Sequence, residues 1–247
     1  MTLRINSISK QFSHRFKTVE ALKEISFFVK DGEFVCLVGP SGCGKSTLLS
    51  LIAGLEKSTS GTITSFGKIG YIFQEPTLFP WLNVWDNIAF SLSMNGKPRE
   101  YIQKQVPVYL DLVQLTEFSH AFPHQLSGGM KQKVALVRAL IRRPSILLMD
   151  EPFSSVDTIT RENLYLDLQK IWKLTKTTII FVTHNVREAV CLGDRVLVMS
   201  SRPGHIVKNI RIPLARTRNI DDLRVITLSH KVKKTLVQNS YEKLDAK

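Results

Sequence analysis

A glycine-rich segment near the start of the chain carries a cation and two hydroxyl groups at a spacing that suits phosphate binding. The segment consists of Gly39, Pro40, Ser41, Gly42, Cys43, Gly44, Lys45, Ser46 and Thr47. It matches the pattern GxxxxGK[ST], in which the glycines let backbone N–H groups turn toward phosphate oxygens. Lys45 supplies a positive charge to the outer phosphates, and Ser46 supplies a hydroxyl ligand for Mg²⁺. The segment therefore predicts a loop that binds the phosphates of a nucleotide.

Two acidic residues follow an apolar run farther along the chain. In SILLMDEP the apolar residues predict a buried strand that ends at Asp150, and Glu151 comes next. Asp150 can hold Mg²⁺ through water, and Glu151 can polarise an attacking water molecule. An acidic pair alone is typical of a strand end in solvent. Together with a phosphate-binding loop, the pair indicates phosphoryl-transfer chemistry.

The segments that carry these residues have the pattern of strands alternating with helices. GEFVCLVG precedes the glycine-rich loop and TTIIFVTH ends at His184, and both are short apolar runs typical of buried strands. KSTLLSLIAGL has a helical pattern that ends at Gly54. Apolar strands spaced by helices indicate a parallel sheet covered on both faces. Ligands bind beyond the carboxyl ends of such strands, where the loop, the acidic pair and His184 are expected.

The remaining segments predict a smaller β portion and a helical region. GTITSFGKIGYIFQ is interpreted as either a hairpin or two short strands. Residues 84–143 are largely helical in pattern, with breaks expected at Pro98, Pro107 and Pro123. DRVLVMS and GHIVKNIRIPL are expected to be late strands, and 221–240 is expected to be a helix.

Composition limits the class of protein. The chain has 247 residues, of which 43% are hydrophobic and 22% charged, and this is typical of a folded globular protein. No apolar run reaches the roughly 18 to 20 residues of a membrane span, and the first residues lack the apolar core of a signal peptide. Three cysteines without CxxC spacing predict neither a zinc site nor a disulfide framework. The net charge of +13 suits nucleic acid, phosphorylated ligands or an anionic membrane surface, without choosing among them.

The segment LSGGMKQKVALVRAL resembles the signature segment of the ATP-binding cassette (ABC) family. Three more segments resemble motifs of that family, in the family's order. Gln74 in YIFQEP resembles the Q-loop glutamine, Asp157 in SSVD lies in a D-loop-like segment, and His184 resembles the switch histidine. The resemblance covers about residues 3–210. Departures such as Asn185, where aspartate is common, remove no group that hydrolysis needs.

The resemblance implies an α/β fold of the P-loop NTPase class, with a RecA-like, mostly parallel sheet core, an antiparallel β portion and an inserted helical subdomain. It implies a single ABC ATPase domain over residues 1–247. The core is expected at about 1–78 and 145–210, the helical subdomain at about 79–144, and a C-terminal strand and helix extension at about 205–247.

The resemblance also implies a dimer in which two copies close head to tail around two ATP molecules. One copy would supply the glycine-rich loop with Asp150 and Glu151, and the other would supply Ser127, Gly128 and Gly129. Ser127 is expected to start a helix whose free N–H groups meet a γ-phosphate. A simple helix cap at Ser127 is the plainer alternative, and the two are compatible.

Further roles in binding ATP and Mg²⁺ are implied residue by residue. His184 would bridge the γ-phosphate and Glu151, and Gln74 would contact the metal and the attacking water and sense the transporter subunit. The implied metal ligands are Ser46, Gln74 and Asp150. Phe12 is the candidate for stacking on adenine, with Phe16 as a second candidate and a place in the core as the alternative.

Two functions are compatible with an ABC cassette. One is the motor subunit of a membrane transporter, and the other is a soluble ABC-type ATPase that acts on nucleic acid or ribosomes. The second class commonly has two cassettes, long coiled-coil arms or zinc modules, none of which is seen here. The stretch EPTLFPWLNVWDNIAFSL, just after Gln74, places Trp81 and Trp85 where transporters receive a helix of the membrane subunit. We therefore expect a transporter subunit that does not act on nucleic acid.

LFPWLNVWDNI, FPHQLSGGM and SSRPGHIVKNIRIPL together resemble the nitrate/sulfonate/taurine subfamily of importers. One expected partner is a second cassette subunit, either an identical copy in a homodimer or a paired cassette subunit. Permease subunits are expected to contact the region of Gln74, Trp81 and Trp85. An extracytoplasmic solute-binding protein is an indirect partner. The expected location is the cytoplasmic face of the cell membrane, as a peripheral protein. Because the permease and the binding protein choose the solute, this sequence does not name it.

Overall fold

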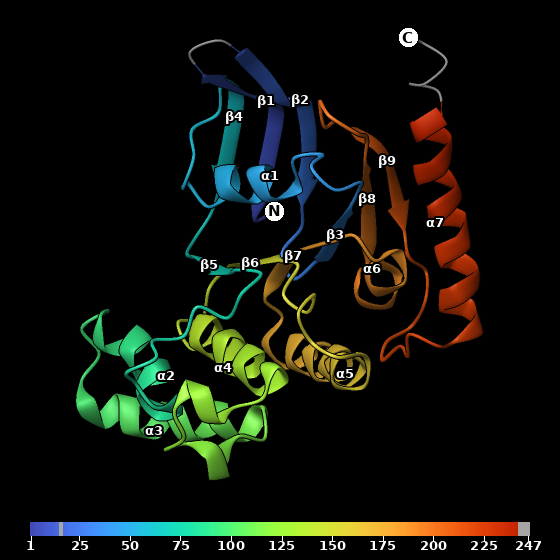
Figure 1. The fold of residues 1–247 in the computed structure, drawn as a ribbon. Helices are drawn as coiled ribbons and strands as arrows, with labels where there is room; N and C mark the ends of the chain where they lie inside the picture. Colours follow the sequence, from blue (N-terminus) through green and yellow to red (C-terminus); the bar gives the residue numbers. More distant parts are fainter. Residues whose placement is uncertain (15–16, 242–247) are drawn as a thin grey trace. The chain divides into compact units, whose positions relative to one another are not determined.

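The structure is a computed structural model that describes residues 1–14 and 17–241. It consists of two compact units (Figure 1). The first unit contains Met1–Gly67 and Thr178–Lys247, and the second contains Lys68–Thr177.

The first unit combines an antiparallel sheet with a mainly parallel one. Its elements are β1 (Leu3–His14), β2 (Lys17–Val29), β3 (Phe34–Val38), α1 (Lys45–Ile52), β4 (Ser60–Ser65), β7 (Thr178–Thr183), α6 (Val186–Leu192), β8 (Arg195–Met199), β9 (Ile206–Arg211) and α7 (Leu223–Tyr241). In the antiparallel sheet β1 lies between β2 and β4. Leu3, Ile5 and Ile8 of β1 are buried while Arg4 and Asn6 are exposed, so one face of this sheet contributes to the core.

The parallel strands of the first unit are almost entirely buried. β3 lies between β7 and β8 and is parallel to both, and β9 adds an antiparallel edge to β8. Every residue of β3 and β7 is buried, as expected for strands covered on both faces. α6 contacts β3, β7 and β8, and α7 contacts α6, β8 and β9; Figure 1 shows α7 running beside β9. The carboxyl ends of β3 and β7 are in register, with Val38 opposite Thr183.

The second unit is mostly helical. Its elements are β5 (Ile69–Ile72), α2 (Val84–Ser93), α3 (Arg99–Leu112), the 3₁₀ helices η1 (Thr116–Phe118) and η2 (Pro123–Gln125), α4 (Gly128–Leu140), β6 (Ile146–Asp150) and α5 (Thr158–Thr175). β5 and β6 are parallel, with Ile72 opposite Met149. α2 contacts α3 and α4, and α4 contacts α5, so the apolar faces of these helices form the core of the unit.

Residues 60–72 form two short strands, one of the two expected alternatives, because β4 pairs with β1 and β5 pairs with β6. One detail differs from the expectations. Pro107 lies inside α3 and does not end it. Proline leaves the carbonyl of Gln103 without its usual helical donor. Ile102, Val106 and Leu110 nevertheless bury one face of α3, and this packing outweighs the local cost.

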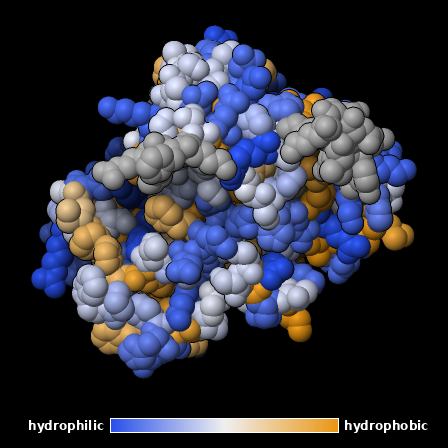
Figure 2. Space-filling model, turned by 45° about the horizontal axis from the view of Figure 1, so that its top comes forward, coloured by the Kyte–Doolittle hydropathy of each residue, from blue (hydrophilic) through white to orange (hydrophobic). Residues whose placement is uncertain are grey.

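Figure 2 shows one face of the molecule, on which most residues are hydrophilic and hydrophobic residues gather in small groups. None of the helices within the described residues has the length and apolar character needed to cross a membrane.

Candidate functional site

The glycine-rich loop lies in the first unit, between the buried strand β3 and the helix α1. Gly42 and Gly44 have φ angles of 72° and 100°, which side chains other than glycine rarely adopt. A Cβ atom at Gly44 would also lie 2.6 Å from Leu22 Cδ2. The loop therefore needs glycine for its backbone path as well as for access to a ligand.

Lys45 is held over this loop. Its side chain is buried, and its ammonium donates to the carbonyl oxygens of Gly39 at 2.9 Å and Pro40 at 3.1 Å. Ser46 follows on the first turn of α1 and is exposed. Cys43 is buried in the loop, and a Cβ atom on Gly39 would come within 2.8 Å of its Sγ. The Lys45 ammonium and the Ser46 hydroxyl thus both lie at the end of the loop, as phosphate and Mg²⁺ binding requires.

His184 lies beside this loop. Val38 and Thr183 are paired at the ends of adjacent parallel strands, so Gly39 and His184 follow at the same edge of the sheet. The Thr183 hydroxyl accepts a hydrogen bond from the backbone N–H of Asn185 at 2.9 Å and donates to the buried carboxylate of Glu188. These contacts fix the turn that carries the exposed His184 side chain.

Residues 202–204 support the glycine-rich loop through contacts that the sequence analysis did not predict. We call the hydrogen bonds from Arg202 the brace of the loop. Arg202 Nε and Nη2 donate to the carbonyl oxygen of Gly42 at 3.2 and 3.1 Å. Gly204 donates from its N–H to Ala21 at 2.9 Å, and a Cβ atom on it would lie 2.1 Å from the Cys43 carbonyl oxygen. The only signal was the Arg-Pro-Gly turn after DRVLVMS, and no spacing rule connects that turn to the loop.

Phe12 is placed where a ring face could meet a ligand. It lies on β1 opposite Val19, is 42% exposed, and has Lys10 Nζ 4.6 Å from its ring centroid. Its exposure argues against a place in the core, and stacking on adenine stays a prediction. Phe16 lies outside the described residues.

The acidic pair lies in the second unit. Asp150 is the last residue of β6, and the Tyr71 hydroxyl donates to its Oδ2 at 3.4 Å. Glu151 has a φ angle of 44°, in the left-handed region that costs a non-glycine residue roughly 1–2 kcal/mol. The N–H and hydroxyl of Ser154 donate to the Glu151 carbonyl oxygen at 3.2 and 3.0 Å. This turn holds the strained backbone and sets the direction of the Glu151 side chain.

Gln74 lies just after β5, the strand next to β6. It comes two residues after β5, its side chain is exposed, and β5 is parallel to β6. Its carbonyl oxygen accepts a hydrogen bond of 3.2 Å from Nε2 of Gln132, which is 2% exposed. Gln132 belongs to α4, so the helix that starts at the signature segment also holds the Gln74 backbone. No motif or spacing in the sequence indicates this contact.

The signature residues form the start of α4. Ser127 is the N-cap, and its hydroxyl accepts a hydrogen bond from the Met130 N–H at 3.3 Å. Ser127 and Gly128 are exposed, whereas a Cβ atom on Gly129 would lie 2.3 Å from Thr160 Cγ2. Ser127 is therefore a helix cap, as in the plainer interpretation, and Gly129 allows a close contact between helices. The first N–H groups of α4 still lie at an exposed helix start, where an anion is favoured.

Asp157 caps α5. Its carboxylate accepts a hydrogen bond from the Thr160 N–H at 3.0 Å, and the hydrogen bonds from Thr160 lower the pKa of Asp157. A role as a D-loop residue stays a prediction.

The aromatic stretch after Gln74 forms a rigid loop with an exposed tip. Asn87 is fully buried, and its amide donates to the carbonyl oxygens of Phe79 at 3.2 Å and Leu82 at 2.8 Å. Trp81 is 70% exposed at the tip, with its ring centroid 5.4 Å from that of Phe79. Trp85 on α2 is half-buried. Trp81 therefore belongs to the surface rather than to the core.

The predicted site residues are divided between the units. The first unit brings together the glycine-rich loop and His184. In the second unit, Gln74 follows β5 and Asp150 ends the adjacent parallel strand β6. Ser127 and Gly128 are exposed at the start of α4 in the second unit.

A glycine-rich loop that joins a buried parallel strand to a helix, with lysine and serine at its end, defines a P-loop NTPase. Comparison with known proteins narrows this class. Residues 22–154 match the family model described as ABC transporter. The chain belongs to the ABC transporter family.

Relatives of known name match nearly the whole chain. It is 44% identical to the aliphatic sulfonates import ATP-binding protein SsuB of Bacillus cereus, with 98% of this chain and 97% of the relative covered. It is 45% identical to the nitrate import ATP-binding protein NrtD of Synechocystis, with 87% and 84% covered. It is 42% identical to the taurine import ATP-binding protein TauB of Roseobacter denitrificans, with 91% and 87% covered.

Solved structures match the fold. A dimeric post-hydrolysis state of the ATP-binding cassette MJ0796 bound to ADP and Pi has a TM-score of 0.74 and 30% identity. A second dimeric structure of that bacterial ABC transporter cassette has a TM-score of 0.76 and 29% identity. Each comparison covers 86% of this chain and all of the other chain. The predicted α/β P-loop fold and the predicted family are confirmed.

Proposed function

We propose that this chain is the ATP-binding and ATP-hydrolysing motor subunit of a membrane ABC importer, of the nitrate/sulfonate/taurine type. A dimer of cassettes would couple ATP hydrolysis to solute uptake at the cytoplasmic face of the membrane. The observation that carries the proposal is the loop of Gly39–Thr47 beside His184, at paired ends of adjacent parallel strands. Family membership and the import subunits among the relatives support it over action on nucleic acid or ribosomes.

Nucleotide binding would rest on the first unit. The loop N–H groups and Lys45 would bind the phosphates, and the exposed ring of Phe12 would stack on the adenine. Lys45 already lies over the loop through its contacts with Gly39 and Pro40, so a phosphate would replace carbonyl oxygens as its partners.

The donor set fits Mg²⁺. The Ser46 hydroxyl, the Gln74 amide oxygen and the Asp150 carboxylate are oxygen donors, which this hard cation prefers, and it usually keeps several waters and binds substrate phosphates. Among the described residues, no group of three or more His, Cys, Asp or Glu forms a metal cluster. When bound, the ion would neutralise charge on the phosphates.

Hydrolysis would use Glu151 and His184. Glu151 would accept a proton from the attacking water as general base, and its fixed backbone turn would keep the carboxylate in one direction. His184 would hold the γ-phosphate and Glu151 through its ring nitrogens, from a turn that Thr183 and Glu188 fix. Gln74 would orient the water.

The second half of each site would come from a second copy. Ser127, Gly128 and Gly129 would present the start of α4 to the γ-phosphate on the partner copy, with Asp157 near the junction. The dimeric structures of a cassette at about 30% identity support a dimer of cassettes.

Mixing two inactive variants tests the proposed function. Lys45→Ala should weaken ATP binding about ten- to a hundredfold, because it removes a charge-assisted contact. Ser127→Arg should retain ATP binding but block closure. Each should lack Mg²⁺-dependent ATPase activity alone. A mixture should regain part of it, because heterodimers contain one site with both surfaces intact. Wild-type protein without ATPase activity, or demonstrated heterodimers without recovery, would contradict the proposal.

The membrane partner would dock at the exposed aromatic loop. Trp81 and Trp85 would contact a short helix of the permease, and Gln74 would sense the position of that helix. Two hydrogen bonds hold this loop. Asn87 donates to the Leu82 carbonyl oxygen at 2.8 Å, and Arg138 donates to the Thr77 carbonyl oxygen at 2.7 Å. A rigid loop with an exposed tryptophan suits a partner interface.

A further inference from the structure

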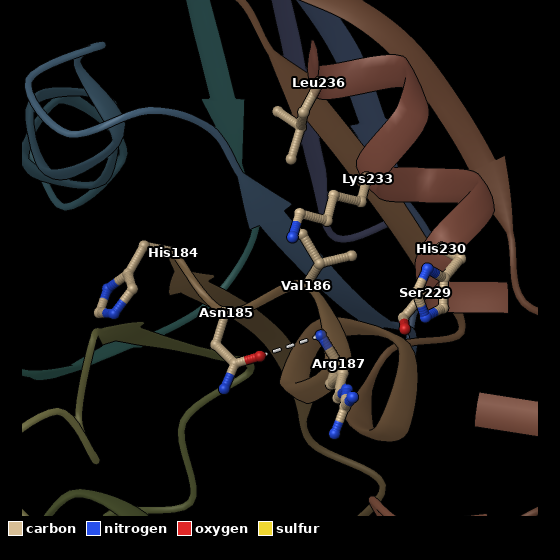
Figure 3. Close-up of a pocket in the computed structure, with 8 residues that line it drawn as sticks. All are labelled: His184, Asn185, Val186, Arg187, Ser229, His230, Lys233 and Leu236. Carbon is tan, nitrogen blue, oxygen red and sulfur yellow. Dashed lines mark hydrogen bonds between the residues drawn. The ribbon is translucent and has the colours of Figure 1, made fainter. Parts of the chain in front are cut away.

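A cavity of 570 Å³ lies in the first unit, between the segment that carries the switch histidine and the C-terminal helix α7. One wall includes His184, Asn185 and Arg187, and the other includes Ser229, His230 and Lys233 (Figure 3). In the close-up, the Lys233 side chain reaches from α7 toward the segment that carries His184 and Val186. We name this cavity the switch pocket.

Packing and hydrogen bonds hold both walls of the switch pocket in place. On α7, Val225, Ser229 and Val232 are buried at helical spacing, so α7 packs on the unit through this face. The Ser229 hydroxyl donates to the Ile226 carbonyl oxygen at 2.7 Å. On the opposite wall, Asn185 caps α6 by accepting from the Arg187 N–H at 3.0 Å, as the dashed line in Figure 3 shows. The pocket is therefore part of the fold rather than a gap between loose segments.

The charge of the lining is one-sided. Lys233 and Arg187 are cationic, and His230 adds a ring that can donate a hydrogen bond, while the lining contains no carboxylate. Within residues 1–14 and 17–241, none of these three groups forms an ion pair. Val186 and Leu236 complete the lining with apolar surface. Cations from two chain segments beside apolar side chains suit an oxyanion that carries a short apolar body.

We propose that the switch pocket binds a small organic oxyanion, such as a phosphate monoester, and that its occupation slows ATP hydrolysis. The second half of this proposal rests on the proposed function. His184 forms part of the wall, so an anion that bridges Lys233 and the switch segment binds best to one position of that segment. A ligand shifts a protein toward the state that it binds more tightly. The anion also places negative charge beside the histidine that must meet the γ-phosphate.

Binding is tested with phenyl phosphate as the probe. The full chain carries Lys45→Ala in this assay, so that the glycine-rich loop does not dominate anion binding, and calorimetry measures the affinity. Adding Lys233→Ala and His230→Gln should weaken binding about tenfold or more, because the Lys233 charge and the His230 imidazole are both lost. Lys234→Ala is the matched control: it removes the same charge from the next residue of α7, which is exposed and does not line the pocket. Because all three side chains are exposed, the variants should fold, and thermal melting checks this.

Two further assays measure the effect of phenyl phosphate on ATP turnover and distinguish a free anion from a lipid headgroup. With wild-type Lys45, phenyl phosphate should lower kcat without raising KM for ATP, and Lys233→Ala should abolish that inhibition while leaving basal activity unchanged. Equal binding by the Lys233 and Lys234 variants would overturn the proposal. Lys233-dependent binding to phosphatidylglycerol vesicles without binding of free phenyl phosphate would also overturn it, in favour of a lipid surface. A chain without any ATPase activity would instead contradict the proposed function, while the binding result would still decide the pocket.

Discussion

Replacing Trp81 with alanine separates a role in docking from a role in the core. Trp81 is 70% exposed, so the folded chain buries about three-tenths of a surface of about 250 Å², or about 75 Å². At about 25 cal/mol per Å² the loss is about 2 kcal/mol, which is an upper value because the unfolded chain also buries part of that surface. In a chain of this size the melting temperature should fall by less than about 8 °C.

The effect on assembly should be larger than the effect on folding. An aromatic side chain lost from the centre of an interface costs about 2 kcal/mol or more, which is roughly a thirtyfold loss of affinity. Trp81→Ala should therefore bind ATP normally and lose co-purification with its permease and solute uptake. Leu174→Ala is the control, because Leu174 is 72% exposed on α5 and is not part of the aromatic loop.

Melting, nucleotide affinity and co-purification are measured on the same preparations. A fall in melting temperature above about 12 °C would assign Trp81 to the core, where truncation typically costs about 3 to 5 kcal/mol. Normal assembly and uptake would remove Trp81 from the interface.

Two other substitutions test contacts that support the site. Arg202→Ala removes both hydrogen bonds to the Gly42 carbonyl oxygen and should weaken ATP binding severalfold in a fluorescent-nucleotide titration, whereas Arg211→Ala, an exposed cation on β9, should not change it. Unchanged affinity of the Arg202 variant would show that the loop keeps its shape without this brace. Gln132→Leu leaves the Gln74 carbonyl oxygen without its donor and should cost about 0.5 to 1.5 kcal/mol of stability in denaturant unfolding, with hydrolysis lowered more than nucleotide binding.

The sequence predicted the parts of the site that local pattern determines. The loop of Gly39–Thr47 was predictable because its glycines permit a backbone path that other residues rarely adopt, and the strands around it were predictable because FVCLV and TIIFV are short apolar runs. The edge shared by the loop and His184 followed from the rule that ligands bind beyond the carboxyl ends of parallel strands. Family resemblance supplied the signature segment and its expected partner.

Contacts between distant residues were not predictable from one sequence. The hydrogen bonds of Arg202 to Gly42 and of Gln132 to Gln74 join residues far apart in the chain, and no periodicity or motif indicates them. Pro107 was expected to break a helix because local propensity disfavours it there, yet the buried face of α3 outweighs that preference. The left-handed backbone of Glu151 also had no sequence signal, since glutamate seldom adopts it.

The functional boundaries of the domain and the individual roles of the site residues stay predictions. The structure places the candidate side chains on defined turns, strand ends and helix starts. Biochemical measurements on variants would establish which of them act on ATP.

The variant Glu151→Gln tests the central claim that this chain is an ATP-hydrolysing cassette with Glu151 as general base. The substitution keeps the size of the side chain and removes its basic carboxylate, while the glycine-rich loop that binds ATP is untouched. Steady-state hydrolysis should fall about 10²- to 10⁴-fold, MgATP affinity should stay within about twofold of wild type, and an ATP-dependent dimer should persist in size-exclusion chromatography. Glu117→Gln, an exposed glutamate in η1, serves as the control and should hydrolyse ATP at the wild-type rate. Turnover of Glu151→Gln at the wild-type rate would contradict the account.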